Sequence, residues 1–150
     1  MRVIIQRVSE ASVTIDEKIK SSIDKGLLIL LGIEPTDEVT DIEWLVRKIV
    51  NLRIFPDEKE VMNKSIVDKD YEMLVISQFT LFASTKKGNR PSYLRAAKPD
   101  IAIPLYEKFV EELKKISSLN VGTGEFGEDM KVGLINDGPV TIIIDSKNRE

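Results

Sequence analysis

The order of strand-like and helix-like segments is the feature that most constrains the fold of this chain. Apolar runs or alternations typical of strands occur at Val3–Val8, Ser12–Ile15 and Leu27–Ile33, before any helical pattern begins. Strict strand–helix alternation is missing, so we expect an α+β domain with a mixed or antiparallel sheet. We predict a curved sheet or barrel covered by two main helices. Further strand-like runs are Leu74–Phe79 continuing into Thr80–Ala83, then Leu119–Val121, Met130–Ile135 and Val140–Asp145.

The first predicted helix runs from an N-cap at Thr36 to about Asn51. Asp37 and Glu38 would then lie in its first turn, where the helix dipole favours negative charge. Apolar residues recur at helical spacing and predict its buried face, namely Val39, Ile42, Leu45, Val46, Ile49 and Val50.

The second predicted helix is capped by Asp100 and carries Pro104 in its first turn or just beyond, where a missing N–H has little effect. The segment before it, Ser84–Pro99, is polar and basic and is expected to be mostly loop. Its predicted buried face consists of Leu105, Phe109, Val110, Leu113 and Ile116.

The length of 150 residues fits a single domain, 1–150.

The absence of histidine and cysteine excludes several kinds of chemistry. Catalysis by Ser-His-Asp or Cys-His groups and zinc sites built on imidazole or thiolate are ruled out. No Asp/Glu cluster argues for a metal, so we expect no metal and no cofactor. No apolar run approaches the roughly 20 residues that span a bilayer, and the charged start is unlike a signal peptide, so a cytoplasmic protein without membrane contact is expected.

One stretch of the chain is basic although the net charge is −3. No acid occurs between Glu72 and Asp100, and that stretch holds five cations. This distribution fits a local phosphate contact, with a solvated loop as the alternative. The cations are Lys86, Lys87, Arg90, Arg95 and Lys98.

The run from Ser77 to Leu81 places polar residues where an apolar strand is predicted to end. Such residues need partners, because an unpaired buried donor costs about 1–3 kcal/mol. Backbone N–H groups also become free at a strand end and can point at a ligand. Pairing with neighbouring loops is the alternative.

The run from Asn136 to Thr141 permits two interpretations. Asp-Gly between apolar runs is typical of a tight hairpin. Pro139 argues against it, since proline has no N–H for a strand ladder and restricts Gly138. The chain there could instead offer a surface without side chains that excludes a substituent by collision.

Two further features remain open between function and structure. The Lys87–Tyr93 loop could bind phosphate, with Tyr93 stacking on a base, or be an ordinary polar loop with Tyr93 in the core. Arg7 lies in an apolar strand and could pin a loop through its guanidinium or point to solvent.

Taken together, these segments resemble the D-aminoacyl-tRNA deacylase family from end to end. Two motifs, Ser77-Gln78-Phe79-Thr80 and Gly138-Pro139, are highly specific in combination. Tyr93 stands where phenylalanine is more usual, and Glu128 replaces a small residue. The other matching stretches are Ile5–Val8, Ala11–Val13, Gly26–Gly32, Leu52–Phe55 and Gly88–Ser92, and Asp70-Tyr71 replaces a glycine-containing turn.

The resemblance implies a homodimeric, barrel-like hydrolase that removes D-amino acids, and misattached glycine, from tRNA. Each site would combine Ser77, Gln78, Phe79 and Thr80 of one protomer with a cis Gly138-Pro139 peptide of its partner, which rejects L-amino acids. Arg7 would anchor the Gly-Pro loop. The remaining roles implied are the terminal-adenosine pocket, formed by Ala96, Ala97, Phe126 and Met130, and the tRNA phosphate contacts Lys86, Lys87 and Arg90.

With no histidine available, we expect the 2′-OH of the terminal adenosine, or a water held by it, to supply or activate the nucleophile. Backbone N–H groups around Phe79 and Thr80 would stabilise the oxyanion. A Thr80 nucleophile is the rival mechanism. Two other functions remain as alternatives, a non-catalytic tRNA-binding module and a small-molecule esterase.

Overall fold

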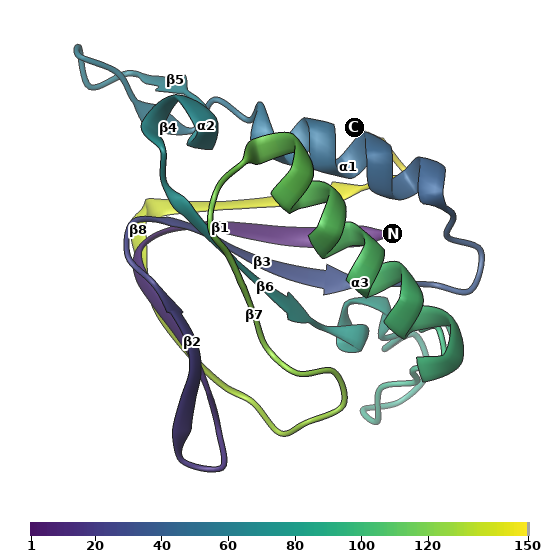
Figure 1. Cartoon of the computed structure of the whole chain (residues 1–150). Helices are drawn as coiled ribbons and strands as arrows, with labels where there is room; N and C mark the ends of the chain where they lie inside the picture. Colours follow the sequence, from purple (N-terminus) through teal and green to yellow (C-terminus); the bar gives the residue numbers. More distant parts are fainter. Residues whose placement is uncertain (150) are drawn as a thin grey trace.

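The long strand β1 (Arg2–Ile15) organises the sheet in the computed structural model, which describes residues 1–149 (Figure 1). Its first half pairs antiparallel with β3 (Gly26–Gly32) and its second half with β2 (Lys18–Ile23). On its other side, β8 (Lys131–Asp145) runs antiparallel along almost its whole length. β6 (Glu72–Ser77) and then β7 (Val121–Thr123) continue the sheet in parallel from β3. The mixed, nearly closed sheet confirms the predicted fold class.

The apolar run of β3 is explained by burial on both faces of the sheet. Leu27, Ile29 and Leu31 face the main core beneath the helices, while Leu28 belongs to a second cluster inside the curved sheet. Neighbouring β6 alternates in the same way, with Met73 and Val75 in the main core, so after Glu72 at its start it carries no polar residue before Ser77. The polar end of β6 is therefore the first place where this part of the sheet can meet a ligand.

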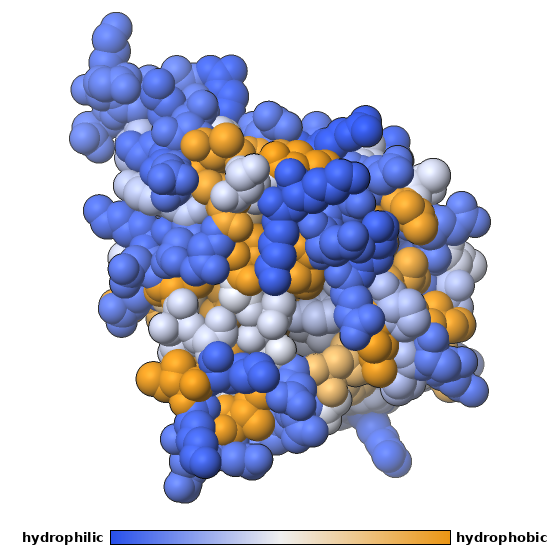
Figure 2. Space-filling view, in the orientation of Figure 1, coloured by the Kyte–Doolittle hydropathy of each residue, from blue (hydrophilic) through white to orange (hydrophobic). Residues whose placement is uncertain are grey.

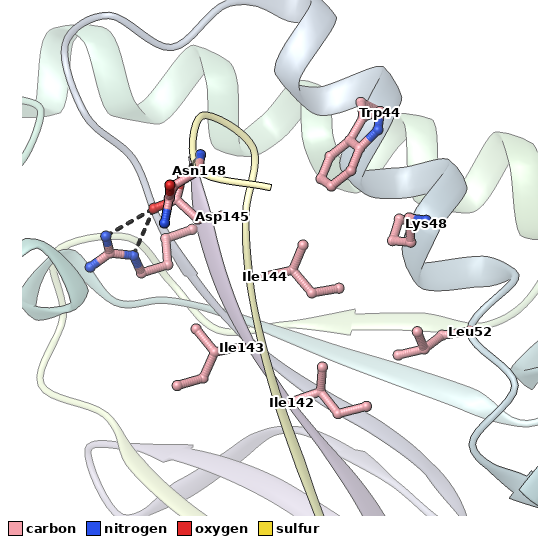
Figure 3. A pocket seen from close by; sticks show the side chains of 9 residues that line it. Trp44, Lys48, Leu52, Ile142, Ile143, Ile144, Asp145 and Asn148 are labelled. Carbon is pink, nitrogen blue, oxygen red and sulfur yellow. Dashed lines mark hydrogen bonds and ion pairs between the residues drawn. The ribbon is translucent and has the colours of Figure 1, made fainter. Parts of the chain in front are cut away.

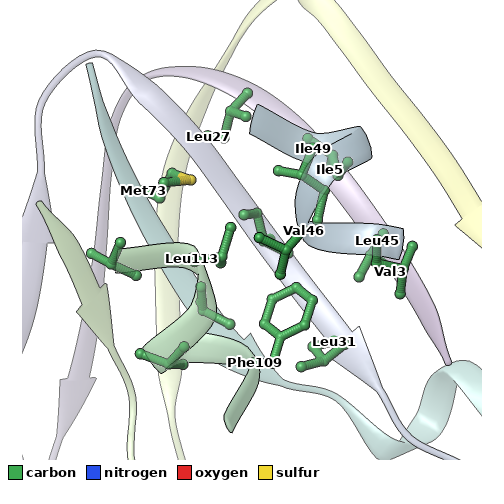
Figure 4. Packing of buried hydrophobic residues seen from close by; sticks show 14 of the residues in the cluster. Val3, Ile5, Leu27, Leu31, Leu45, Val46, Ile49, Met73, Phe109 and Leu113 are labelled. Atoms are coloured by element: carbon green, nitrogen blue, oxygen red, sulfur yellow. The ribbon is translucent and has the colours of Figure 1, made fainter. Parts of the chain in front are cut away.

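Two main helices, α1 (Val39–Val50) and α3 (Pro99–Ser117), cover one face of the sheet, as predicted (Figure 1). Figure 4 shows Leu45, Val46 and Ile49 of α1 packed above β1, with Phe109 of α3 beside them. Most of the outer surface in Figure 2 is hydrophilic, and apolar atoms show mainly between the elements. Among residues 1–149, no helix is long and apolar enough to cross a membrane.

Both helix starts differ from the prediction. Thr36 is in a turn, and the N-cap of α1 is Glu38, whose N–H donates to the Asp41 carboxylate at 2.9 Å. Asp37 is buried and pairs with the N-terminal ammonium, so it lies before the helix instead of in its first turn. The second helix starts at Pro99, because proline suits a first helical position, and Asp100 follows it in the first turn rather than capping it.

The buried face of α3 was predicted partly wrongly. Tyr106 is 7% exposed and belongs to the core, whereas Ile116 is 41% exposed. Leu105 packs only at the core margin, since the spacing from Ala102 through Tyr106 to Phe109 defines the face that meets the sheet. Pro104 lies inside the helix, just beyond its first turn.

The strand boundaries differ because long strands bridge what looked like breaks. Val3–Val8 and Ser12–Ile15 form one strand, β1, and the two predicted C-terminal strands are one strand, β8. The hairpin interpretation of the Asp-Gly run is thus wrong, because both halves of β8 pair with β1 rather than with each other.

Several small elements were not predicted. These are β2, the β4 (Phe55–Pro56) and β5 (Met62–Lys64) pair, and the short helix α2 (Ile66–Lys69). The last short strand runs over Val121–Thr123 instead of Leu119–Val121. The continuation of β6 into Thr80–Ala83 is also wrong, since β6 ends at Ser77 and a 3-10 helix, η1 (Phe79–Phe82), follows.

Candidate active site

The Ser77–Thr80 segment is the point where β6 ends and turns. Ser77 pairs with Leu31 of β3, and the Gln78 N–H donates to the Leu31 carbonyl at 2.8 Å. The Gln78 carbonyl then accepts the Leu81 N–H at 3.2 Å, which begins η1. As the first residues of this helical turn, Phe79 and Thr80 have no preceding carbonyl within it for their own N–H groups. The sequence therefore produces two backbone donors at the rim of the sheet.

The side chains of this turn are only partly covered. The Gln78 amide donates to the Thr80 hydroxyl, which orders both groups. Phe79 is 51% exposed, and its ring meets the edge of Tyr93 with centroids 5.1 Å apart. Tyr93 is thus neither in the core nor free for stacking on both faces, and it links this turn to the basic loop.

A pocket of about 240 Å³ opens beside the turn. Ser77, Gln78 and Phe79 line it, whereas Thr80 does not, and the predicted adenosine residues Phe126 and Met130 line the same pocket. Glu128 lines it too and places an exposed carboxylate there. The remaining lining residues, not singled out from the sequence, are Ile76, Gly127 and Val132.

Ala96 and Ala97 lie outside this pocket. The Ala97 N–H donates to the Ile33 carbonyl at 2.9 Å, and its side chain packs against the main core. The basic residues Lys86, Lys87 and Arg90 are exposed on a loop closed by paired hydrogen bonds between Ser84 and Ser92, and they have no ion-pair partner among residues 1–149.

The Gly138-Pro139 peptide is cis and forms a corner of β8. Four residues, 137–140, bulge from the ladder between the pairs Val8↔Asn136 and Gln6↔Thr141. Polar contacts close the base of this corner, because the Asn136 side chain accepts the Val140 N–H and donates to the Thr141 hydroxyl, both at 2.9 Å.

Arg7 holds the corner from beneath and is only 9% exposed. Its Nε donates to the Asp137 carbonyl at 3.0 Å and lies 3.4 Å from the Asp137 carboxylate, and its Nη1 donates to the Ile54 carbonyl at 2.5 Å. Gly138 has a φ of +126°, and a Cβ there would lie 2.8 Å from the Arg7 Nη2 atom. Only glycine fits this position without displacing the guanidinium.

The two motifs lie at opposite ends of the sheet. Positions in β3 show how far apart they lie. The Gly138 corner lies opposite Arg7 of β1, which pairs with Leu27 of β3, whereas Ser77 of β6 pairs with Leu31 of β3. Four residues along the strands correspond to about 13 Å, and the three strand spacings from β8 to β6 add about 14 Å across the sheet. Figure 1 shows the same arrangement, with the bend of β8 on one side and the end of β6 on the other.

Tyr106 supports the pocket and was not predicted as a site residue. Its hydroxyl donates to the Val75 carbonyl at 2.8 Å, two residues before Ser77. Its ring packs edge to face with Phe126, with the ring centroids 6.2 Å apart. Burial raises the pKa of the Tyr106 hydroxyl, so it stays a neutral donor. The helical spacing of Ala102, Tyr106 and Phe109 is the sequence signal that could have placed it inward.

The described residues contain no group of three or more acidic side chains arranged to hold a metal ion.

Comparisons with known proteins identify the family. The sequence model described as D-Tyr-tRNA(Tyr) deacylase matches residues 4–145. Similar proteins include a D-aminoacyl-tRNA deacylase of Bacteroides fragilis, 67% identical, and one of Flavobacterium psychrophilum, 65% identical, each covering all of both chains.

Two solved structures share the fold. One, titled c-Myc DNA Unwinding Element Binding Protein, is 42% identical with a TM-score of 0.91, and covers 97% of this chain and 98% of its own. The other, titled as a probable eukaryotic D-amino acid tRNA deacylase, has a TM-score of 0.82 at 15% identity, covers 95% and 97%, and supports the fold alone. Since the family model spans nearly the whole sequence and the relatives match it from end to end, the chain belongs to the D-Tyr-tRNA(Tyr) deacylase family, enzymes that hydrolyse the ester of D-aminoacyl-tRNA.

Proposed function

We propose that this deacylase selects its substrate by chirality with a surface that its partner protomer provides. In a homodimer, the Gly138-Pro139 corner of one protomer would close the pocket beside the Ser77–Thr80 turn of the other. The observation that carries this proposal is the separation of the two motifs, roughly 13 Å along the strands and 14 Å across them within one chain. One chain alone does not bring them to one substrate.

The corner is suited to act as a rigid screen. It has no side chain at Gly138, and Arg7 fixes its carbonyl side through the bond to Asp137. A substituent on the substrate α-carbon that points toward such a backbone surface collides with it, whereas a D side chain points away. Glycine has no substituent to reject, so we expect glycyl-tRNA to be hydrolysed as well.

The exposed side of β8 supports a second copy as the partner. Ile143 is 67% exposed and Ile135 is 55% exposed, on a strand whose outer edge has no partner among residues 1–149. Long apolar edge strands are normally covered. A two-fold contact along this strand would carry each Gly138 corner toward the other protomer's pocket.

The proposed reaction relies on the backbone and the substrate. The 2′-OH of the terminal adenosine would hold and activate a water, which attacks the ester carbonyl carbon and forms a tetrahedral oxyanion. Collapse of this intermediate breaks the bond to the ribose 3′ oxygen, which takes the proton of the water and leaves as the free end of the tRNA. The Phe79 and Thr80 N–H groups would stabilise the oxyanion, a contribution of about 2.7–4 kcal/mol per donor in comparable sites. Thr80 is a poor nucleophile here, because its hydroxyl accepts from the Gln78 amide, a group that cannot take up its proton.

The basic loop would hold tRNA phosphates independently of sequence. Lys86, Lys87 and Arg90 are exposed and unpaired among residues 1–149, and the Phe79–Tyr93 contact joins their loop to the pocket wall. Such contacts predict that affinity falls steeply with salt. The substrate is charged tRNA of the cytoplasm.

The test is a pair of deacylation assays on D-tyrosyl-tRNA and L-tyrosyl-tRNA, with glycyl-tRNA alongside and no added metal. Loss of the D and glycyl esters with the L ester intact supports both the reaction and the screen. Equal loss of the D and L esters leaves an esterase and removes the screen. Binding of tRNA without loss of any ester would indicate a non-catalytic binding module, and hydrolysis of small esters that ignores RNA would indicate a small-molecule esterase.

The Gly138→Ala variant separates the screen from the chemistry. Its Cβ meets the Arg7 guanidinium at 2.8 Å, so the corner must shift. Gly133→Ala on the same strand is the matched control, since its Cβ meets only the Ser12 hydroxyl at an ordinary 3.4 Å. We expect Gly138→Ala to change the ratio of D to L hydrolysis and Gly133→Ala to leave it unchanged.

A further inference from the structure

A groove outside the candidate active site separates α1 from the last residues of β8. It measures about 490 Å³ and has an apolar floor of Ile142 and Ile144 with Trp44, Lys48 and Leu52 on the helix side (Figure 3). A second hollow of about 380 Å³ is lined by the same three residues and also by Arg47 and Arg53. Trp44 and Lys48 are four residues apart on one face of α1, and Leu52 follows just beyond the end of the helix, so the three residues form a ridge that borders both hollows.

Four cations gather around this ridge, and acids do not neutralise them. Arg47, Lys48, Arg53 and Arg149 form no ion pair among residues 1–149, whereas the acids of the region, Asp145 and Asp41, are already paired with Arg2 at 2.9 Å and Lys147 at 2.8 Å. Glu43 is exposed on the same helix but lines neither hollow. The surface is thus locally positive on a chain whose net charge is −3.

Two of these cations are positioned by the tryptophan. The Arg149 guanidinium lies 4.2 Å from the Trp44 ring centroid, and the Lys48 ammonium lies 5.7 Å from it. Arg149 also donates from Nε to the Ser146 carbonyl, and Arg53 donates from Nε to the Asn63 carbonyl. Each guanidinium therefore keeps its outer N–H groups for a ligand with fixed geometry, as phosphate recognition requires.

Arg2 links the groove to the η1 turn that follows the candidate active site. It lines the groove and donates from Nη1 to the Leu81 carbonyl at 2.9 Å, and Leu81 belongs to the η1 turn that follows Ser77-Gln78. A chain that enters the pocket by its end can therefore continue from η1 over Arg2 onto the ridge.

We propose that this ridge, together with its two hollows and the neighbouring cations Arg47, Arg53 and Arg149, is a second tRNA contact that binds the phosphodiester backbone beyond the aminoacylated end. Unpaired cations around an aromatic ring match a nucleic-acid backbone. The inference rests on the proposed placement of the substrate end at Ser77–Thr80. A second copy of this chain is expected at Ile143 on the β8 side of the groove, but it fits the ridge less well, because a two-fold contact there would set the same unpaired cations against one another.

The test compares two triple variants that each remove three positive charges from the full-length enzyme. One is Arg47→Gln, Lys48→Gln and Arg149→Gln on the ridge. The matched control is Lys18→Gln, Lys25→Gln and Lys59→Gln, three exposed lysines without ion pairs among residues 1–149 that line neither hollow. Both are measured for binding of uncharged tRNA at several salt concentrations, with circular dichroism melting to verify the fold.

The ridge variant is expected to bind tRNA roughly 10-fold or more weakly, with a slope of log affinity against log salt that is shallower by about 2 to 3. The control is expected to change the slope by less than about 1. Hydrolysis of D-tyrosyl-adenosine, which ends at the terminal nucleoside, reports on the pocket alone. If the unmodified enzyme does not hydrolyse D-tyrosyl-adenosine, this result counts against the proposed function, independently of how the ridge variant binds tRNA.

Three results would overturn the inference. One is an unchanged salt slope in the ridge variant, and another is a slope that changes as much in the control as in the ridge variant. The third is conversion of the ridge variant to monomers in sedimentation, which would assign the ridge to contact between copies of this chain.

Discussion

The two ends of the sheet show how differently a chemical site and a screening surface are built. At the end of β6, the Ser77–Thr80 turn offers backbone donors and a half-exposed Phe79, held by few contacts. At the bend of β8, the Gly138 corner rests on Arg7, a buried guanidinium bound to two carbonyls. The first end needs access for a substrate, and the second needs a fixed backbone. Variants at the two ends should therefore fail in different ways.

The largest effect on activity is expected from Phe79→Pro. Proline removes the Phe79 N–H and is tolerated at a first helical position. If this N–H stabilises the oxyanion, kcat on D-tyrosyl-tRNA should fall by about 10²- to 10³-fold with the melting temperature nearly unchanged. Phe79→Ala removes the ring but keeps the N–H and serves as the control, and a similar loss in both variants would place the effect in the ring.

At the other end, Arg7→Ala should act on stability and selectivity. It leaves the carbonyls of Ile54 and Asp137 without their donor, and we expect a loss of about 2–4 kcal/mol in the free energy of unfolding. Urea denaturation measures this loss. Arg7→Lys keeps the charge but not the forked geometry, so it should retain part of the stability while L-tyrosyl-tRNA becomes a substrate. Full rejection of the L ester by Arg7→Lys would show that the corner does not depend on this anchor.

A smaller effect is expected from Thr80→Val, which keeps the shape and removes the hydroxyl that accepts from Gln78. If Thr80 only orients its surroundings, kcat should fall by about 10-fold, a hydrogen-bond-sized effect of about 1.4 kcal/mol. A nucleophile would be indispensable, so a loss beyond about 10⁴-fold in single-turnover kinetics would establish the rival mechanism.

The smallest effect concerns acid stability, which depends on neither end. Burial by itself would raise the pKa of Asp145, but hydrogen bonds from the Lys147 N–H and Arg2 outweigh it and hold the pKa below 3.8. Asp41 behaves alike, since the Lys147 ammonium lowers its pKa against the effect of burial. Their contribution to stability is fully present above 3.8, the ordinary carboxyl value, and is lost as the pH falls through the lowered pKa values.

Melting curves between pH 6 and pH 2 should therefore be flat at first and fall only in the acid range. The double variant Asp41→Asn and Asp145→Asn should melt lower at neutral pH and lose less on acidification. If the melting temperature of the double variant falls as steeply in acid as that of the unchanged protein, the pH dependence comes from other carboxylates.

The fold was predictable where patterns are local and was missed where pairing is remote. The apolar run of β3 and the helical spacing of α1 are local signals, and both elements formed as expected. The unity of β8 depends on the 14-residue length of β1, which spans both halves, and no local pattern near Gly138 reveals it. The cap of α1 moved for a similar reason, because the distant N-terminal ammonium takes up Asp37.

For the candidate site, the polar strand end and the Gly-Pro run were visible in the sequence, and Phe126 and Met130 line the same pocket as Ser77. Ala96 and Ala97 were expected in that wall and lie outside it, since Ala97 is held at Ile33. The ridge around Trp44 could not be predicted, because Arg149 joins α1 only through the fold.

The central claim, that each site needs two protomers, is tested most directly by subunit complementation. Phe79→Pro protomers, which have lost most of their activity, and Gly138→Ala protomers, which are expected to hydrolyse the L ester, are co-expressed with different affinity tags, and the purified mixed dimers are assayed on D- and L-tyrosyl-tRNA. In a shared site, the one competent pocket of each mixed dimer belongs to the Gly138→Ala protomer and faces the unchanged Gly138 corner of its partner, so the mixed dimers hydrolyse the D ester and again reject the L ester. If each protomer built its own site, that pocket would keep its own altered corner, and the mixed dimers would hydrolyse the L ester as the Gly138→Ala enzyme does.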